Sequence, residues 1–185
     1  MEKNITIIGG GLAGSEAAYQ IAKRGIKVKL YEMKPSKFSP AHSNCNLAEI
    51  VCSNSFKSNL ITNESGLLKE ELRQLDSLLI KIADEVQVPA GQALAVDREK
   101  FAEEVTKRLE QFANIEVIRQ EVGKEISVKQ LAENGIVIIA TGPLTSESLS
   151  KEIQELTGED KLYFYDAAAP IIEKNSINMN IGFYG

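Results

Sequence analysis

Three glycines near the N-terminus have the spacing of a turn that cradles a dinucleotide. They follow the apolar run 5–8 and precede a run of small residues. In such a turn the first glycine permits a tight bend, the second lets the backbone approach a pyrophosphate, and the third lets the helix pack closely on the strand. Unpaired N–H groups and the helix dipole favour an anion there. The predicted binding residues are Gly9, Gly10, Gly11, Leu12, Ala13 and Gly14.

A glutamate follows this turn at the spacing expected for a ribose-binding acid. The first helix is predicted to end at Lys23-Arg24-Gly25, and residues 26–32 then alternate like a second strand that ends in Glu32. The Glu32 carboxylate is placed to accept hydrogen bonds from the ribose hydroxyls of an adenosine. The alternative is an ordinary glycine turn followed by a solvated glutamate at a strand end.

Two further places carry residues that suit a bound cofactor. The apolar strand predicted at 135–140 ends in Thr141 and Gly142, so a second cofactor-facing loop is expected there. Arg98 begins a helix that Asp97 is well placed to cap, and its guanidinium could contact a phosphate. A first-turn arginine more often has no specific partner, so both interpretations of Arg98 stay open.

Cys52 is the candidate nucleophile or base. It follows the apolar pair Ile50-Val51 and precedes the donors at 53–55, which could stabilise a thiolate, more so if they open a helix. Without other information, a cysteine after apolar residues is usually a small buried hydrophobe. Cys45 has no assigned role. His42 could touch a cofactor, although a lone loop histidine is more often solvated.

The segment around the cysteines has a charge of its own. Between residues 34 and 58 the basic residues Lys34, Lys37 and Lys57 face only Glu49, so this segment is mildly basic and favours an ionised thiol. The whole chain carries a net charge of −5, which weakens any expectation that it grips nucleic acid alone. Two cysteines and one histidine give no metal-ligand spacing, so no metal site is expected.

The bulk composition predicts a globular protein. With 185 residues and 43% hydrophobic content the chain can bury a core. No apolar run approaches the roughly 20 residues that cross a bilayer, and the N-terminus lacks the features of a signal peptide. We therefore expect a cytoplasmic protein without a membrane segment, whose two cysteines are free thiols.

The remaining pattern alternates helices with strands. One long amphipathic helix with a core-facing stripe fits 66–86, a strand or hairpin fits 88–96, and helices fit 98–112 and 146–156, the latter closed by Gly158. Strands are predicted at 115–119, at 135–140 as a buried strand, and at 162–172.

This order predicts an α/β protein with a three-layer, Rossmann-like FAD/NAD(P)-binding fold. The strands 5–8, 28–32 and 137–140 should lie side by side, with their glycine turns at one edge. We expect the N-terminal part of the binding domain at 1–145 and the start of an inserted or substrate domain at 146–185. Because the chain stops just after a new element begins, we expect a fragment.

Several motifs together resemble a known class. The glycine turn with its strand-end acid, the turn 140–142 and the helix start at 97–98 are similar to those of flavoproteins with two dinucleotide-binding domains, which implies FAD. Within that class, AEIVCSNSFKS at 48–58 and FYDAAAP at 164–170 resemble the folate- and FAD-dependent tRNA (uracil-5-)-methyltransferases. The resemblance extends from residue 1 to about residue 181.

The resemblance implies an activity, its cofactors and a partner. Such enzymes convert the T-loop uridine of tRNA to 5-methyluridine, with the carbon from 5,10-methylenetetrahydrofolate and electrons from NAD(P)H through FAD. The reaction needs a thiolate because carbon 5 of uracil becomes nucleophilic only after a thiolate adds to carbon 6. A base must later remove the proton from carbon 5, and a cysteine can serve in either step. Members use two cysteines. Cys52 matches one of them, and the other belongs to a later part of the protein.

Three points remain open at this stage. A tRNA wobble-uridine-modifying flavoprotein begins with a similar turn, although Val51-Cys52-Ser53 favours the methyltransferase. A non-catalytic FAD-binding remnant is the second alternative, because we expect the chain to be truncated to about half of such a protein. A homodimer is the third open point, on which the sequence is silent.

Overall fold

The core of the protein is a four-stranded parallel sheet. In the computed structural model, which describes residues 4–158 and residue 178, the strand order is β6-β2-β1-β7. The strands are β1 (Asn4–Ile8), β2 (Lys27–Tyr31), β6 (Ile115–Ile118) and β7 (Ile136–Ile139). Ile5 pairs with Val28 on one side and with Ile136 on the other. The predicted neighbourhood of these three strands is therefore confirmed, and their carboxyl ends share one edge.

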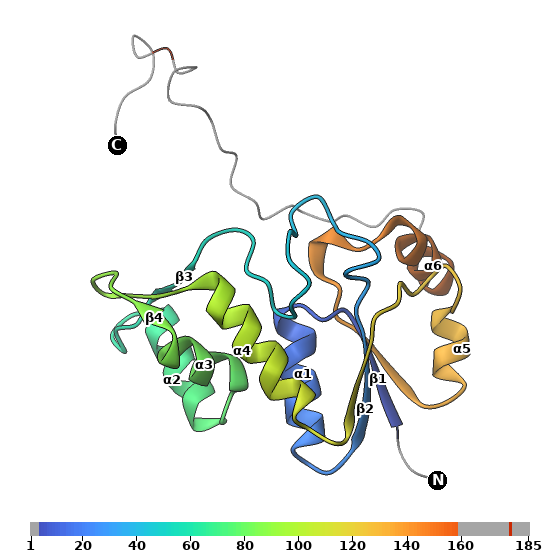
Figure 1. The fold of residues 1–185 in the computed structure, drawn as a ribbon, viewed down its shortest axis with the longest axis horizontal. Helices are drawn as coiled ribbons and strands as arrows, with labels where there is room; N and C mark the ends of the chain where they lie inside the picture. Colours follow the sequence, from blue (N-terminus) through green and yellow to red (C-terminus); the bar gives the residue numbers. More distant parts are fainter. Residues whose placement is uncertain (1–3, 159–177, 179–185) are drawn as a thin grey trace.

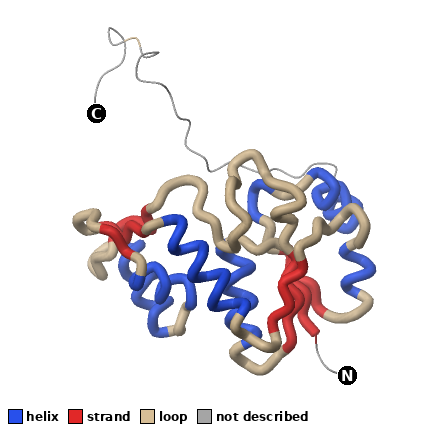
Figure 2. The backbone as a smooth tube through the Cα atoms, in the orientation of Figure 1, coloured by secondary structure: helices blue, strands red, loops and turns tan. Residues whose placement is uncertain are grey.

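Helices cover both faces of this sheet, which gives the predicted three layers (Figure 1). On one face, α1 (Leu12–Ala22) and α4 (Arg98–Glu110) pack with α3 (Leu78–Glu85) over a core centred on Ile7, Leu30 and Phe101, all 0% exposed. On the other face, α5 (Val128–Ala132) and α6 (Glu147–Thr157) enclose a smaller cluster that contains Ile8, Tyr31 and Leu149. Figure 2 shows the sheet between these two groups of helices.

A second, antiparallel sheet lies near the N-terminal end of α4, whereas β6 follows the C-terminal end of that helix. It has the order β3-β5-β4, from β3 (Ser55–Ser58), β4 (Gln87–Val88) and β5 (Ala93–Val96). The last two form the hairpin expected in residues 88–96. The helix α2 (Glu64–Gln74) packs on β3, and its Lys69 ammonium donates to the Phe56 carbonyl at 2.7 Å.

The single long helix predicted at 66–86 is wrong. The structure has two helices there, because Asp76 adopts φ 56° and Ser77 caps α3 by accepting from the Ile80 N–H. The predicted core stripe is wrong for the first helix as well. Leu67, Leu68 and Leu75 are 48, 55 and 69% exposed, and the stripe is buried only in α3.

The other helix ends follow the predicted signals. Asp97 caps α4 by accepting from the Lys100 N–H, and Gly158 closes α6 in the left-handed conformation. The short helix α5, which was not predicted, has a capping box between Ser127 and Gln130. The burial predicted for β7 is wrong at its ends: among the described strands it pairs only with β1, and Ile136 and Ile139 are 61 and 40% exposed.

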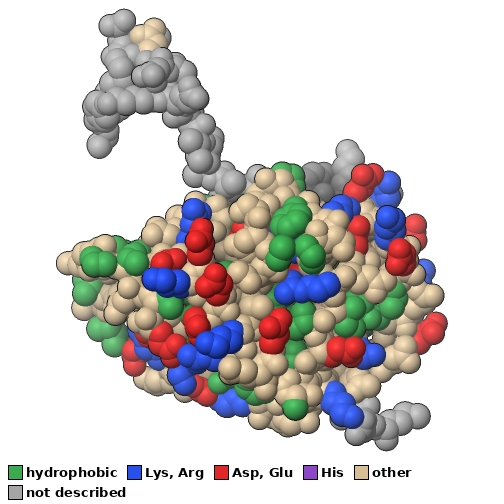
Figure 3. Space-filling model, viewed as in Figure 1, with side chains coloured by type: hydrophobic (Ala, Val, Ile, Leu, Met, Phe, Trp, Pro, Cys, Tyr) green, Lys and Arg blue, Asp and Glu red, His purple; other side chains and the backbone are tan. Residues whose placement is uncertain are grey.

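The surface shows no large region of one charge on the face drawn in Figure 3, where basic and acidic side chains are interspersed. Within residues 4–158, every helix is too short or too polar to cross a membrane. The strand predicted at 162–172 and the motif at 164–170 lie outside the described residues. The division at residue 145 stays a prediction.

Candidate functional site

The glycine turn lies at the carboxyl end of β1, between its two neighbours. Gly9 adopts φ 105° and donates its N–H to the Tyr31 carbonyl at 2.8 Å, while the Ala140 N–H donates to the Ile8 carbonyl at 2.8 Å. The turn is thus fixed from both sides by backbone hydrogen bonds. This edge of a parallel sheet is where ligands of such folds bind.

The three glycines differ in what surrounds them. A Cβ on Gly9 would lie 2.7 Å from the Ala140 carbonyl oxygen, and one on Gly14 would overlap the Gly9 carbonyl oxygen. These two glycines are required by packing alone. A Cβ on Gly11 would meet nothing within 4 Å, and Gly11 has φ −73°, which any residue adopts. Packing and backbone conformation therefore leave room for a side chain at Gly11.

The N-terminus of α1 is open to an anion. Gly11 is its N-cap, with no side-chain cap and no acidic residue in the first turn. The first N–H groups of a helix lack acceptors within it, and they carry the positive end of the helix dipole. This arrangement suits a phosphate group.

Glu32 is buried next to the glycine turn at residues 9–14, which we call the cradle, and it is not solvated. Its side chain joins the turn to the next loop, because Oε2 accepts from the Gly10 N–H and Oε1 from the Lys34 N–H, each at 3.0 Å. A carboxylate has about four acceptor positions. Two of them are used here, so the group retains capacity to accept from ribose hydroxyls.

A hollow extends from the turn across the edge of the sheet. Its wall contains three of the predicted glycines, Glu32, and Thr141 after β7, whose Oγ1 lies 2.6 Å from Thr145 Oγ1. Leu12, Ala13, Gly14 and Gly142 adjoin the wall in sequence but do not line it. Lys34 and Glu49, which the sequence indicated only as charges of the segment 34–58, also line the wall. Other wall residues that the sequence did not indicate include Met33, Val122, Leu144 and Ser146.

His42 also lines this hollow, half-buried. Its Nδ1 lies 2.5 Å from Ser39 Oγ. Burial, followed by the nearby Lys34 ammonium, holds the pKa of His42 below its usual value. The imidazole is therefore neutral at neutral pH and can offer one donor and one acceptor.

Cys52 lies outside the hollow, in the loop that enters β3. Its side chain is exposed, so the buried, purely packing role is contradicted. The conditional helix is contradicted too, because residues 53–55 lead into a strand. The Asn54 amide donates to the Val96 carbonyl at 3.3 Å, and the Ser55 N–H donates to Ser53 Oγ at 3.3 Å.

The basic environment predicted for Cys52 is largely neutralised. Lys34 pairs with Glu49 at 3.1 Å, and Lys37 pairs with Glu121 at 2.6 Å. Burial raises the pKa of Glu121, but hydrogen bonds from Lys37 and Ser148 outweigh it, so the pKa is below its usual value. Of the three lysines, only Lys57 in β3 remains exposed without an acidic partner among the described residues.

Arg98 lies in a different hollow from the glycines. Together with Ser53, Asn54 and Val96 it lines a space of about 440 Å³ at the start of α4. The structure therefore brings Arg98 to the segment that follows Cys52, not to the wall around Glu32. Its predicted role with a cofactor remains untested.

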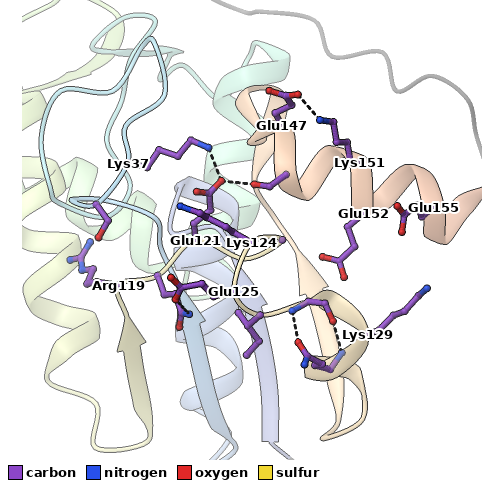
Figure 4. A pocket seen from close by; sticks show the side chains of 17 residues that line it. Lys37, Arg119, Glu121, Lys124, Glu125, Lys129, Glu147, Lys151, Glu152 and Glu155 are labelled. Carbon is purple, nitrogen blue, oxygen red and sulfur yellow. Dashed lines mark hydrogen bonds and ion pairs between the residues drawn. The ribbon is translucent and has the colours of Figure 1, made fainter.

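A larger groove of about 1070 Å³ adjoins the cradle but has the wrong chemistry for an anion. It is lined by the loop after β6 and by the facing sides of α5 and α6 (Figure 4). Five basic and five acidic residues line it, and several pair with one another, as Lys151 does with Glu147 at 2.7 Å. Within the described residues, no group of three His, Cys, Asp or Glu side chains could hold a metal ion.

Comparison with known proteins gives a family match over almost the whole chain. The profile of the family described as "Glucose inhibited division protein A" matches residues 4–184. The chain is 58% identical over 181 residues to the methylenetetrahydrofolate–tRNA-(uracil-5-)-methyltransferase TrmFO of Lactobacillus johnsonii, covering 98% of this chain and 40% of that protein. It is 59% identical over 184 residues to the protein of the same name from Fusobacterium nucleatum, covering 100% of this chain and 41% of the relative.

Among solved structures, the chain is similar to the GidA-related protein from Thermus thermophilus. The identity is 17% and the TM-score 0.35, over 64% of this chain and 38% of that one. The chain spans about two-fifths of the length of the curated relatives that it matches.

Proposed function

Because the chain belongs to the glucose inhibited division protein A family, we propose that it is the N-terminal part of a folate- and FAD-dependent tRNA (uracil-5-)-methyltransferase. The observation that supports this most directly is the identity of 58% to a protein of that name, over 98% of the chain. The reaction proposed is the formation of 5-methyluridine in the T-loop of tRNA. The carbon donor is 5,10-methylenetetrahydrofolate.

We propose FAD as the dinucleotide of the cradle. The free space at Gly11, the uncapped start of α1 and the acceptor capacity of Glu32 all suit an adenosine with a pyrophosphate. Thr141 and His42 supply further polar groups in the same wall. When bound, FAD supplies redox chemistry, with NAD(P)H as the proposed reductant.

Cys52 is the proposed catalytic residue. Its thiol is exposed, and the residues that follow it in the chain line a hollow with Arg98, where a substrate or the far part of a cofactor could be held by the Asn54 amide and the Arg98 guanidinium. The thiolate would add to carbon 6 of uracil or remove the proton from carbon 5. The interspersed surface charges and the net charge of −5 imply that tRNA contacts other parts of the protein as well.

The decisive experiment compares Cys52→Ala with Cys45→Ala in the full-length protein. Both cysteines are exposed, so either change should alter the free energy of unfolding by less than about 0.5 kcal/mol. Methyl transfer to a tRNA transcript should fall about 10²- to 10⁴-fold in Cys52→Ala and stay unchanged in Cys45→Ala. Near-normal transfer by Cys52→Ala, with FAD bound, would contradict the assignment.

The competing functions have their own outcomes. An absorbance spectrum of the purified protein should show bound flavin, and a colourless protein that binds no added FAD would favour a remnant. Modification of the wobble uridine in place of the T-loop uridine, read by nucleoside analysis of the tRNA, would favour the other flavoprotein. A cytoplasmic location stays part of the proposal.

A further inference from the structure

The loop that leads from the cradle to Cys52 encloses a buried ion pair. Lys34 Nζ lies 3.1 Å from Glu49 Oε2, and the two side chains are only 3 and 7% exposed. The same ammonium donates to the Asn46 carbonyl at 2.7 Å. The pair thus joins the first residues of the loop to its last ones.

The other carboxylate oxygen of Glu49 accepts hydrogen bonds from the middle of the loop. Oε1 accepts from the Ser43 N–H at 2.8 Å, from the Ser43 hydroxyl at 3.0 Å and from the Asn44 N–H at 3.2 Å. Burial raises the pKa of Glu49, but the hydrogen bonds from Ser43 and Lys34 outweigh it and hold the pKa below its usual value. The carboxylate is therefore ionised at neutral pH.

Two backbone hydrogen bonds connect the ion pair to the cradle, one from Lys34 and one from the residue before Glu49. Lys34 donates its backbone N–H to Glu32, the acid whose other oxygen holds Gly10. Ala48, the neighbour of Glu49, donates its N–H to the Gly10 carbonyl at 2.8 Å. A continuous path thus runs from the cradle through Lys34 to Glu49, three residues before Cys52.

Stability alone does not explain this pair. A buried ion pair gives little or no stabilisation over an apolar pair of similar volume, because desolvation offsets the attraction. Its distinctive property is a fixed geometry, since both charges must keep their partners. In this loop the pair fixes Glu49, which lies three residues before Cys52 in the chain.

We propose that Lys34 and Glu49 are positioning residues that couple occupancy of the cradle to the position of the Cys52 thiol. A ligand that bonds to Glu32 restrains Gly10 and Lys34, and the ion pair transmits this restraint to Glu49 and the segment after it. The proposal rests on the proposed function for the dinucleotide site and for the role of Cys52.

The test measures how ADP changes the alkylation rate of Cys52. ADP carries the ribose and pyrophosphate without a flavin ring, so the ring cannot shield the thiol. In a Cys45→Ser parent, which leaves Cys52 as the thiol of this loop, saturating ADP should slow alkylation of Cys52 by iodoacetamide about fivefold or more. Peptide mass spectrometry follows Cys52 itself, calorimetry supplies the ADP affinity, and Tm reports folding.

The decisive variant is Lys34→Met with Glu49→Gln in that parent. It removes both charges and keeps an acceptor for Ser43 and Asn44. Because both residues also line the hollow, the ADP affinity of the variant is measured first, and alkylation is compared at ADP concentrations that saturate each protein. At saturation the effect of ADP on the alkylation rate should fall to about onefold, because the coupling is lost. The control Lys37→Met removes another lysine of the loop, which pairs with Glu121, and should keep the full effect.

An unchanged ADP effect in the double variant, or no effect in the parent, overturns the coupling. If the double variant does not fold, Glu49→Gln alone decides: its ADP effect should be smaller than that of the parent, and an equal effect overturns the coupling. If the parent does not bind ADP, both nucleotide binding at the cradle and its coupling to Cys52 are overturned. If the Cys45→Ser parent shows the ADP effect but Cys52→Ala transfers methyl groups normally, only the proposed catalytic role of Cys52 is overturned.

Discussion

At the scale of single residues, the glycine turn separates what the fold requires from what a ligand requires. Gly9 and Gly14 have no room for a Cβ, so any larger residue there disturbs the turn itself. Gly11 has room and ordinary backbone angles. A substitution at Gly11 can therefore remove binding with little effect on folding.

Gly11→Val should reduce FAD affinity at least about tenfold, because its methyl groups occupy the space next to the N-terminus of α1. The unliganded variant should lose only about 1 kcal/mol of stability, since valine is a poorer N-cap than glycine. Titration of the apoprotein with FAD and urea unfolding measure the two effects. The comparison variant Gly14→Ala should have a much lower free energy of unfolding than the wild type, because its Cβ overlaps the Gly9 carbonyl oxygen. An unchanged FAD affinity in Gly11→Val would contradict the proposal that FAD binds at the glycine turn.

At the scale of elements, one carboxylate decides where a helix begins. Glu16 of α1 accepts from the Ser77 hydroxyl at 2.9 Å and from the N–H groups of Leu78 and Leu79 at 3.3 and 3.1 Å. It thereby caps α3 from a different helix. Together with the left-handed Asp76, this contact divides the long helix that the leucine spacing had suggested.

Glu16→Ala should destabilise the protein by about 1–2 kcal/mol, because the start of α3 loses its charged acceptor. Glu71→Ala, in the exposed part of α2, is the matched control and should change stability by less than about 0.5 kcal/mol. Urea unfolding gives both values. Equal effects of the two substitutions would show that the contact to α3 carries no stability.

The sequence predicted the elements whose signals are local. The parallel strands, the capped starts at Asp97 and Ser146 and the end at Gly158 are confirmed, because each depends on a short segment. The break before Ser77 combines the left-handed Asp76 and the Ser77 cap with a contact from Glu16, which is distant in sequence, so helical spacing alone could not predict it. The same applies to the site: Glu32 and Thr141 were found through their strand ends, whereas the pairing of Lys34 with Glu49 follows from the path of a loop.

At the scale of the whole molecule, the candidate site residues are divided between two sheets. The parallel sheet carries the glycine turn, Glu32 and Thr141, and the antiparallel sheet receives the segment after Cys52. The loop with the buried ion pair connects them. The arrangement allows the cradle to be rigid while the thiol stays accessible.

The stability of the molecule should fall in acid through Glu49 and Glu121. The native pKa of each is lowered, by contacts that outweigh burial, so it lies below that of an unfolded glutamate, about 4.3. Their stabilisation is complete above that pH and is lost as the pH falls through the lower native values. Urea midpoints measured from about pH 6 down to about pH 3 should fall less steeply in Glu49→Gln than in the wild type. A control at an exposed, uncharged residue, Gln74→Ala, removes no ionisable group and should keep the wild-type slope.

The position of β1 between β2 and β7 has a consequence for synthesis on the ribosome. β2 follows β1 after one helix, but β7 comes near the end of the described chain, and Gly9 packs against Ala140 just beyond it. At about 5–20 residues per second, the interval lasts on the order of ten seconds. Throughout that time one edge of the nascent β1 has no permanent neighbour, and the nucleotide cradle cannot close. Binding of a dinucleotide at this turn is therefore expected only after β7 has been made, and not when β1, α1 and β2 alone are complete.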